Sequence, residues 1–284
     1  MTELLKVTGL STHIGSEKKP LKPVDNVSFC IEKGKTFALL GESGCGKSLT
    51  ALSLIRLNPQ PASRIVAGTV ELAGEDLLAL SEADMEHIRG RRIAMIFQEP
   101  QSSLNPVLTV GQQIGESLQW HFKMRGKALH NRIISLLSSV GIPDPQQRFK
   151  DYPHQLSGGM KQRIMIAIAL AGEPELLIAD EPTTALDVTI QAQILDLLKE
   201  IQRETQMAIL LISHDLAVVA QMADDIAVMY AGQIVEIAPR EQFFKQVKHP
   251  YSKKLFESLP TAQKRQHRLT VIKGNVPALD KVFN

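Results

Sequence analysis

The sequence predicts an α/β fold with a mostly parallel sheet, an antiparallel β subdomain at the N-terminus and an inserted α-helical subdomain. Three observations support this prediction. Short apolar segments alternate with helical segments over much of the chain, which is typical of parallel sheets covered by helices. Closely spaced strand patterns open the chain, whereas residues 99–155 show only helical periodicity.

Composition fits a protein with a sizeable core. A chain of 284 residues suffices for one large domain, or one domain with an inserted lobe. Its net charge of +2 gives no electrostatic indication of nucleic-acid binding. Two cysteines, Cys30 and Cys45, give no disulfide framework and fit a reducing compartment. The N-terminus lacks the basic and then apolar pattern of a signal peptide, and no apolar run reaches the ~18 residues of a membrane span. We therefore expect a cytoplasmic protein.

The predicted elements define the domain organisation. In order, we expect strands at 4–10, 24–31 and 36–40, a helix from 47 to about 57, a strand at 68–72, a charged helix at 81–92 and a strand at 93–97. After the helical lobe we expect strands at 175–180, 208–213 and 225–231, with helices at 189–204 and after 214. We therefore predict one domain of about 4–255, with a core at 1–98 and 156–232, a lobe at 99–155 and a C-terminal extension at 233–284. No clear core pattern is expected after Gly232.

The stretch GESGCGKS, 41–48, is a G-x-x-x-x-G-K-S pattern that follows a predicted strand and opens a predicted helix. Glycines there let backbone N–H groups curl around a phosphate, and the helix N-terminus adds partial positive charge. Lys47 would place an ammonium on the outer phosphates, and the Ser48 hydroxyl would ligate Mg²⁺. The pattern predicts a P-loop nucleoside triphosphatase with a RecA-like core. The residues expected at the nucleotide are Gly41, Glu42, Ser43, Gly44, Cys45, Gly46, Lys47, Ser48 and Leu49.

Asp180 ends the apolar strand predicted at 175–180, and Glu181 directly follows it. Ligands bind at the carboxyl ends of strands in such sheets, so we expect Asp180 beside the phosphate loop, holding Mg²⁺ through its water shell. Glu181 would accept a proton from an attacking water. The alternative is an exposed acidic pair at a turn, but acids placed directly after a buried strand favour a functional site.

Six motifs between Gly41 and His214 resemble those of the ATP-binding cassette (ABC) family and occur in the family's order. LSGGMKQ (156–162) is similar to its signature sequence, GESGCGKS to its phosphate loop, and LLIADEP to its magnesium and base strand. Gln98 resembles the family's phosphate-sensing glutamine, TALD (184–187) its dimer loop, and His214 its switch histidine. The resemblance implies that ATP is hydrolysed with Glu181, His214 and Gln98 as catalytic residues. It also implies Mg²⁺ ligands at Ser48, Gln98 and Asp180.

The signature stretch suggests a second nucleotide-binding surface. Ser157 is a natural helix N-cap, and Gly158 and Gly159 would expose N–H groups at the start of a helix. The resemblance implies that this turn covers the γ-phosphate held by the opposing subunit of a head-to-tail dimer. Asp187 of the dimer loop is assigned to the nucleotide on the same ground.

Two further positions, Ile14 and Cys45, bear on the predicted nucleotide site. The family usually offers the adenine an aromatic ring from the end of the first strand, where this sequence has Ile14 beside His13. Base stacking should therefore be weak, or another residue should supply it. Cys45 is expected as a spacer in the loop, although a helix N-terminus lowers a thiol pKa and would make it reactive.

Finer resemblance points to the dipeptide and oligopeptide importer branch, which also handles nickel and glutathione. It is carried by IRGRRIAMIFQEPQSSLNPVLTVGQQI and by HPYSKKLFESLP (249–260), and it covers about residues 3–260. KGNVPAL (273–279) resembles the start of that branch's cysteine-bearing tail, but no cysteine follows. The chain is thus expected to be either a subunit with a truncated tail or the first half of a two-cassette protein.

The resemblance implies an ATP-hydrolysing subunit of a membrane importer for peptides or a similar small solute, peripheral on the cytoplasmic face of the cell membrane. Its implied partners are a second cassette, identical or different, two permease subunits and, indirectly, a solute-binding protein. A soluble ABC-type ATPase of DNA repair or translation is the alternative, but zinc cysteines, a long coiled coil or a basic linker would then be expected, and nucleic acid is not predicted as a partner. A regulatory module that only holds ATP would be expected to lack Glu181 or His214.

Overall fold

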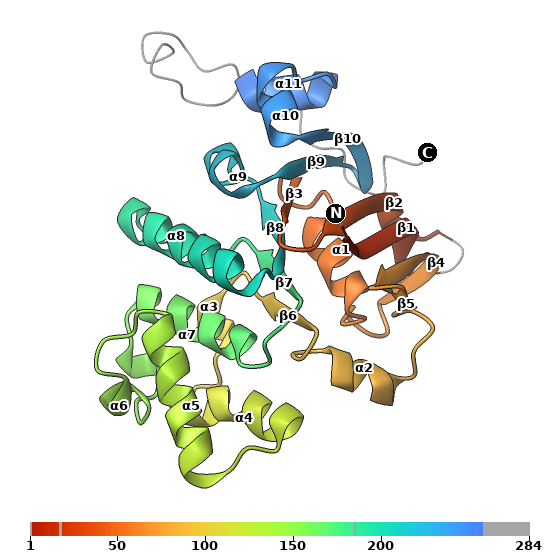
Figure 1. Cartoon of the computed structure of the whole chain (residues 1–284). Helices are drawn as coiled ribbons and strands as arrows, with labels where there is room; N and C mark the ends of the chain where they lie inside the picture. The colour runs from red at the N-terminus through yellow and green to blue at the C-terminus, as the bar shows by residue number, and fades with distance from the viewer. Residues whose placement is uncertain (1, 17–18, 185, 258–284) are drawn as a thin grey trace. The chain divides into compact units, whose positions relative to one another are not determined.

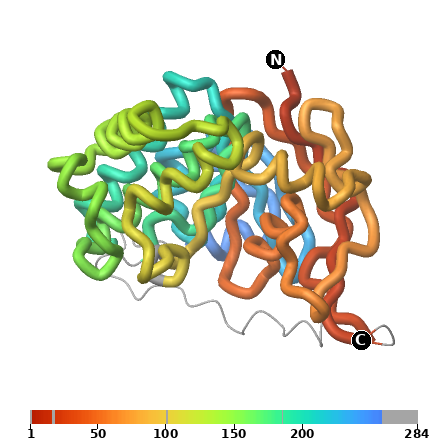
Figure 2. Tube along the Cα trace, turned by 90° about the horizontal axis from the view of Figure 1, so that it is seen from below, coloured from red at the N-terminus to blue at the C-terminus, as the bar shows by residue number. Residues whose placement is uncertain are grey.

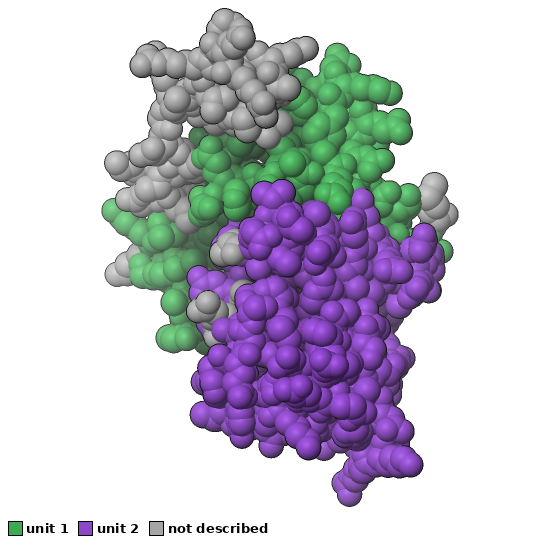
Figure 3. All heavy atoms as spheres, turned by 90° about the vertical axis from the view of Figure 1, so that its left-hand side faces the viewer, with its two compact units in different colours: residues 1–79, 210–284 green, residues 80–209 purple. Residues whose placement is uncertain are grey.

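The computed structural model describes residues 2–16, 19–184 and 186–257 (Figure 2). It divides the chain into two compact units (Figure 3). Unit 1 comprises residues 1–79 together with the chain from 210 onward, and unit 2 comprises residues 80–209. These divisions do not coincide with the boundaries predicted at 98, 156 and 232, and the predicted subdomain assignment stays a prediction. The KGNVPAL stretch lies outside the described residues.

The antiparallel sheet predicted at the N-terminus is present in unit 1. Its strand order is β2-β1-β4-β5. The strands are β1 (Glu3–Ile14), β2 (Leu21–Glu32), β4 (Ser63–Leu72) and β5 (Glu75–Asp76). β1 continues past the predicted end at residue 10 because Thr12, although polar and fully buried, shares a 2.8 Å hydrogen bond with the Ser53 hydroxyl. A buried polar residue can therefore extend the strand.

A β-bulge shapes the pairing of β1 with β4. Thr8 pairs with Thr69 and Ser11 with Ala67, so Gly9 and Leu10 together face Gly68. A Cβ on Gly68 would lie 2.5 Å from the Leu10 Cα, and the φ of Gly68 is +99°. Glycine is required here by both the close approach of the backbone and the positive φ.

The apolar strands of unit 1 form the second part of its core (Figure 1). The strand order is β10-β9-β3-β8. The strands are β3 (Thr36–Leu40), β8 (Ala208–Ser213), β9 (Asp225–Tyr230) and β10 (Gln233–Pro239). The division into units assigns the first two residues of β8 to unit 2. β3 and β9 are parallel, and both β3 and β8 are buried throughout, as expected of strands covered on both faces.

The expectation that no core pattern follows Gly232 was wrong. β10 pairs antiparallel with β9, and the side chains of Phe243 and Tyr251 are buried beyond it. They lie on α10 (Arg240–Lys245) and α11 (Pro250–Glu257). The pattern was missed because β10 is an edge strand with few buried positions, so its hydrophobic alternation is weak.

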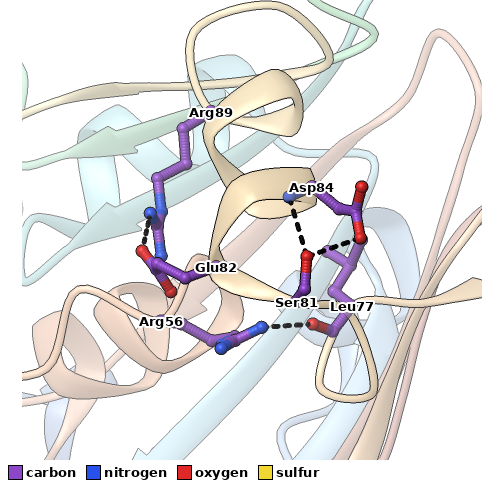
Figure 4. A network of polar contacts seen from close by, with 6 residues as sticks. All are labelled: Arg56, Leu77, Ser81, Glu82, Asp84 and Arg89. Carbon is purple, nitrogen blue, oxygen red and sulfur yellow. Dashed lines mark hydrogen bonds and ion pairs between the residues drawn. The ribbon is translucent and has the colours of Figure 1, made fainter.

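Two helices end earlier than predicted. α1 (Lys47–Leu54) ends before the prolines at 59 and 61, because Arg56 adopts a left-handed conformation with φ 54°. The N–H of Leu57 then donates to the Leu52 carbonyl at 2.9 Å, which closes the helix C-terminus. In the same unit, Arg56 Nη1 donates to the Leu77 carbonyl at 3.4 Å (Figure 4).

In unit 2, α2 (Glu82–Ile88) is likewise shorter than the predicted charged helix. The Ser81 hydroxyl accepts the Asp84 N–H at 3.2 Å and caps the start of α2 (Figure 4). The helix ends because Arg89, its C-cap, has extended backbone angles.

Unit 2 contains the remaining strands and most of the helices. β6 (Ile93–Ile96) and β7 (Leu176–Asp180) pair in parallel. The other helices are α3 (Pro100–Ser103), α4 (Val110–Phe122), α5 (Gly126–Ser139), α6 (Pro145–Arg148), a 3-10 turn at Pro153–Gln155, α7 (Gly158–Leu170) and α8 (Val188–Thr205). α7 contacts α3, α4, α5 and β6, which explains why apolar residues lie on all its sides.

In unit 1, α9 (Leu216–Met222) follows β8. Within the described parts of the chain, no helix is long and apolar enough to cross a membrane.

The bulge predicts a large difference between two glycine substitutions. Gly68→Ala should lower the free energy of unfolding by about 2–4 kcal/mol, because its Cβ would overlap the β1 backbone. Gly74→Ala is the matched control: Gly74 also has a positive φ, +86°, but its Cβ would have no atom within 4 Å. That change should cost about 1 kcal/mol. Urea unfolding followed by circular dichroism compares the two, and equal midpoints would contradict this account of the bulge.

Candidate functional site

The loop 41–48 joins β3 to α1 in unit 1, as the motif predicts. Gly46 is the N-cap of α1 and has φ 110°, and a Cβ there would lie 1.9 Å from the Pro23 carbonyl oxygen. At the start of the loop, a Cβ on Gly41 would lie 2.4 Å from the carbonyl oxygen of Met229 in β9. Backbone contacts on both sides therefore fix the path of the loop and explain the glycines at these positions.

Lys47 is the central side chain of the loop. Its side chain is buried, with 4% exposed, and its ammonium donates to the carbonyl of Gly41 at 2.8 Å and that of Glu42 at 2.9 Å. A buried ammonium needs such acceptors, because an unpaired buried charge is costly. The cation is thus held inside the curl of the backbone, at the N-terminal end of a helix, where phosphate is favoured.

The other residues predicted at the nucleotide differ in their burial. Ser43, Gly44 and Ser48 are exposed, and Glu42 and Leu49 are half-buried. Cys45 is fully buried, and its carbonyl accepts the Gly232 N–H at 2.9 Å. Burial raises the pKa of the Cys45 thiol, and the nearby Lys47 only partly opposes this. The suggestion that the helix N-terminus makes Cys45 reactive was therefore wrong, because burial outweighs the local positive charge.

The acids predicted at the end of β7 lie in unit 2, and both are buried: Asp180 is 4% exposed and Glu181 8%. Two donors reach the same Glu181 oxygen, Oε2: the Gln98 amide at 2.9 Å and the Thr184 hydroxyl at 2.9 Å. Glu181 also has φ 48°, an uncommon conformation for a residue with a side chain. Strained residues held by their surroundings are typical of functional sites.

The signature turn and the dimer loop are neighbours in unit 2. Ser157 is the N-cap of α7, and its hydroxyl accepts the Met160 N–H at 3.3 Å. A Cβ on Gly159 would lie 3.0 Å from Ile190 Cγ2 in the first turn of α8. Asp187 caps α8 by accepting the Ile190 N–H at 2.9 Å. Ser157, Gly158 and Asp187 are exposed, so both helix starts lie at the surface, and the N-terminus of a helix favours an anion.

His214 and Ile14 lie in unit 1. His214 is exposed and directly follows β8, and Asp215 caps α9 by accepting the Ala217 N–H at 2.7 Å. Ile14 is the last residue of β1, is half-buried and pairs with Leu21 and Ser63. His214 directly follows a strand at the boundary predicted, whereas Ile14 ends a strand that is longer than the one predicted at 4–10.

Sequence reasoning missed two side chains that touch candidate site residues. The Thr184 hydroxyl donates to Glu181, although Thr184 was recognised only as part of the dimer loop. The Tyr251 hydroxyl accepts the Glu42 N–H at 3.2 Å, a contact between α11 and the phosphate loop. The available signal was the aromatic residue in HPYSKKLF, which suits a buried rather than an exposed helix start.

The chain is similar to characterised transport ATPases. A family model described as "ABC transporter" matches residues 24–184, and one described as "Oligopeptide/dipeptide transporter, C-terminal region" matches residues 235–284. A dipeptide transport ATP-binding protein of Bacillus subtilis is 52% identical over 279 residues, which cover 98% of this chain and 83% of that protein. An oligopeptide transport ATP-binding protein of Bacillus subtilis is 49% identical over 282 residues, which cover 99% of this chain and 86% of that protein.

Solved structures show the same fold. A dimeric ATP-binding cassette in a post-hydrolysis state, bound to ADP and Pi, superimposes with a TM-score of 0.75 and 25% sequence identity. The match covers 84% of this chain and 99% of that one. The predicted fold class is therefore confirmed.

The position of Lys47 predicts its contribution to binding. Charge-assisted hydrogen bonds from its ammonium to phosphate contribute ~1.5–3 kcal/mol each, so Lys47→Ala should weaken MgATP binding by about ten- to a hundred-fold. Isothermal titration calorimetry measures the affinity, and circular dichroism checks the fold. Lys35→Ala is the control, because Lys35 instead pairs with Asp224 at the surface. Unchanged affinity in a folded Lys47→Ala protein would show that the loop is not the phosphate site.

Proposed function

Because the chain belongs to the ABC transporter family, we propose that it is the ATP-hydrolysing subunit of a membrane importer for peptides or a similar small solute. The observation that supports this most strongly is identity of about half along nearly its whole length to peptide transport ATP-binding proteins. The match of residues 235–284 to the oligopeptide/dipeptide transporter C-terminal region favours this branch over a soluble ATPase of DNA repair or translation.

ATP binding is assigned to the loop 41–49. The buried Lys47 ammonium is held at the loop's centre by carbonyls, and a triphosphate would supply anionic oxygens that bind an ammonium more strongly. The N–H groups at the start of α1 add to this attraction. The strand end expected at the adenine carries the aliphatic Ile14 in place of an aromatic ring.

Glu181 is assigned as the general base for the attacking water. Its carboxylate is oriented by Gln98 and Thr184, which both donate to Oε2. A base must be fixed within hydrogen-bond reach of the proton it takes, and two donors to one oxygen restrict its rotation. Gln98 thus acts through Glu181 as well as in the phosphate contact inferred from its motif. His214 is assigned to the γ-phosphate because it occupies the position of the family's switch histidine.

The residues proposed for Mg²⁺ fit that ion chemically. Ser48, Gln98 and Asp180 offer hydroxyl, amide and carboxylate oxygens, which Mg²⁺ prefers. Within the described residues, no cluster of three or more His, Cys, Asp or Glu side chains forms a metal cage. Mg²⁺ bound with a nucleotide does not need one, because waters and phosphate oxygens complete its shell. When bound, the ion would neutralise charge on the phosphates.

The proposed partners follow from the same assignment. A second cassette would place its signature turn, Ser157 to Gly159, over the nucleotide of this subunit, and the exposed helix starts of α7 and α8 suit such a contact. Two permease subunits and, indirectly, a solute-binding protein would complete an importer with this chain on the cytoplasmic face. The predicted subdomains, a core, a lobe at 99–155 and a C-terminal extension, are retained in this proposal.

A groove in unit 2 is the proposed contact for a permease helix. It has a volume of about 400 Å³, and its lining includes Gly111, Gly115, Gln119, Leu129, Ile133 and Phe149. Gly111 and Gly115 on α4 let the side chains of Phe149 and Ile133 pack close to that helix. The lining is largely apolar, as a groove for an amphipathic helix requires.

Glu181 provides a test of the catalytic assignment. Glu181→Gln should bind MgATP with nearly unchanged affinity but hydrolyse it about 10²–10⁴-fold more slowly, because general-base catalysis contributes that much to the rate. Phosphate release in single-turnover and steady-state assays measures the loss. Glu200→Gln, an exposed change on α8, is the matched control and should hydrolyse ATP normally.

The same variant tests whether each ATP site is formed by two subunits. Without hydrolysis, ATP should hold Glu181→Gln as a dimer in size-exclusion chromatography with light scattering. Adding Ser157→Arg should prevent that dimer while leaving ATP binding by the monomer intact. Full ATPase activity of Glu181→Gln, or a monomer that turns over at the normal rate at any concentration, would rule out this mechanism.

Importer function is tested in the cell that makes the protein. A tagged chain purified from detergent-solubilised membranes should retain polytopic membrane subunits, and its deletion should abolish uptake of a radiolabelled dipeptide mixture. Gln119→Trp, at the rim of the α4–α5 groove, should lose the membrane subunits, because the indole would fill the groove. Glu116→Trp, exposed on the same helix but outside the groove lining, is the control. Recovery with nucleic acid or ribosomes instead of membrane subunits would support the soluble ATPase.

A further inference from the structure

A segment beyond the predicted core is anchored firmly in unit 1. We call residues 248–252, which include the start of α11, the HPY segment. The Glu236 carboxylate on β10 accepts the N–H groups of Lys248 at 2.9 Å and His249 at 3.0 Å, one on each oxygen. His249 Nδ1 in turn accepts the Tyr251 N–H at 3.2 Å. These bonds fix the backbone around Tyr251 to the edge strand β10. Figure 1 shows α11 near β10.

Tyr251 extends from this anchor to the phosphate loop. Its side chain is only 9% exposed, and its ring packs against Tyr230 with centroids 4.5 Å apart. Its hydroxyl accepts the N–H of Glu42 at 3.2 Å. Burial raises the pKa of Tyr251, so the phenol stays neutral throughout the physiological range. The contact is therefore a neutral hydrogen bond in a largely water-excluded place, where such bonds are stronger than in water.

The Glu42 N–H belongs to the same peptide unit as the Gly41 carbonyl. That carbonyl accepts the Lys47 ammonium at 2.8 Å. One rigid peptide plane therefore joins the Tyr251 hydroxyl on one side to the Lys47 ammonium on the other. Rotation of this plane would break both hydrogen bonds together, and each bond polarises the peptide in the sense that strengthens the other.

We propose that Tyr251 is a positioning residue of the nucleotide site, whose hydroxyl orients the Gly41–Glu42 peptide plane and so places the Lys47 ammonium for the phosphates of ATP. The proposal rests on the assignment of loop 41–49 to ATP. It makes the HPY segment part of the nucleotide site, acting through the backbone of the loop. Movement of α11 would then change the affinity for ATP without touching the nucleotide.

The decisive variant is Tyr251→Phe in the full chain. Phenylalanine keeps the ring against Tyr230 but removes the acceptor for the Glu42 N–H. The dissociation constant for MgATP and the KM should rise about two- to ten-fold, the effect of one neutral hydrogen bond, while kcat changes by less than about two-fold. Tyr230→Phe is the matched control: it keeps the ring pair and the Tyr251 hydroxyl, and should bind MgATP like the wild type.

A double-mutant cycle distinguishes positioning from a general loss of stability. If Tyr251 acts through Lys47, Tyr251→Phe should have little further effect on MgATP affinity in a Lys47→Ala background, measured by titration into the millimolar range. Equal effects of Tyr251→Phe in both backgrounds, or wild-type affinity in folded Tyr251→Phe, would overturn the proposal. The ATP assignment itself would fail only if Lys47→Ala alone left binding unchanged.

A second variant keeps the test independent of the folding of Tyr251→Phe. Glu236→Ala removes the acceptor that anchors the N–H groups of Lys248 and His249, but it leaves the phenol in place. It should raise the KM for MgATP in the same direction as Tyr251→Phe. Glu241→Ala, an exposed change on α10, is its control. An unchanged KM in folded Glu236→Ala would show that the HPY segment does not set the loop.

Discussion

A buried ammonium determines the arrangement of unit 1 around its functional loop. Lys47 is 4% exposed, and removing a charge from water costs several kcal/mol unless close acceptors replace the lost hydration. The carbonyls of Gly41 and Glu42 supply them, so the chain must curl back within a few residues. That curl requires the left-handed Gly46, and it brings the loop backbone so close to β9 and to Pro23 that side chains do not fit at Gly41 or Gly46.

In unit 2, a buried negative charge likewise depends on close polar partners. Glu181 is a buried carboxylate, and neutral donors on Gln98 and Thr184 hold it. The partners described here for Lys47 are also neutral, namely backbone carbonyls. Neutral partners orient a charged group and leave its formal charge in place. An ammonium held in this way still attracts phosphate, and a carboxylate held in this way still accepts a proton.

The sequence allowed prediction of the features that depend on local chemistry. The glycines and Lys47 of the loop, the N-cap at Ser157 and the acids after β7 each follow from a spacing that one strand or helix end requires. Left-handed backbone conformations and the contacts that depend on them could not be predicted. The bond from Thr184 to Glu181 depends on a turn geometry with φ 48°, and the end of α1 depends on Arg56 in a left-handed conformation rather than on the prolines that follow. Neither residue type indicates that conformation in advance.

The contact of Tyr251 with the loop shows why such links are invisible in sequence patterns. The group that Tyr251 contacts is a backbone N–H, which every residue except proline carries. The type of residue at position 42 therefore does not indicate the contact. Substitution of the Glu42 side chain should therefore leave the bond intact. The geometric requirement falls instead on the partner: an acceptor of fixed length must extend from a rigid element, and a buried tyrosine on an anchored helix meets that requirement. The loop that we propose binds phosphate through its backbone would thus also be adjustable through its backbone, by any element that can present such an acceptor.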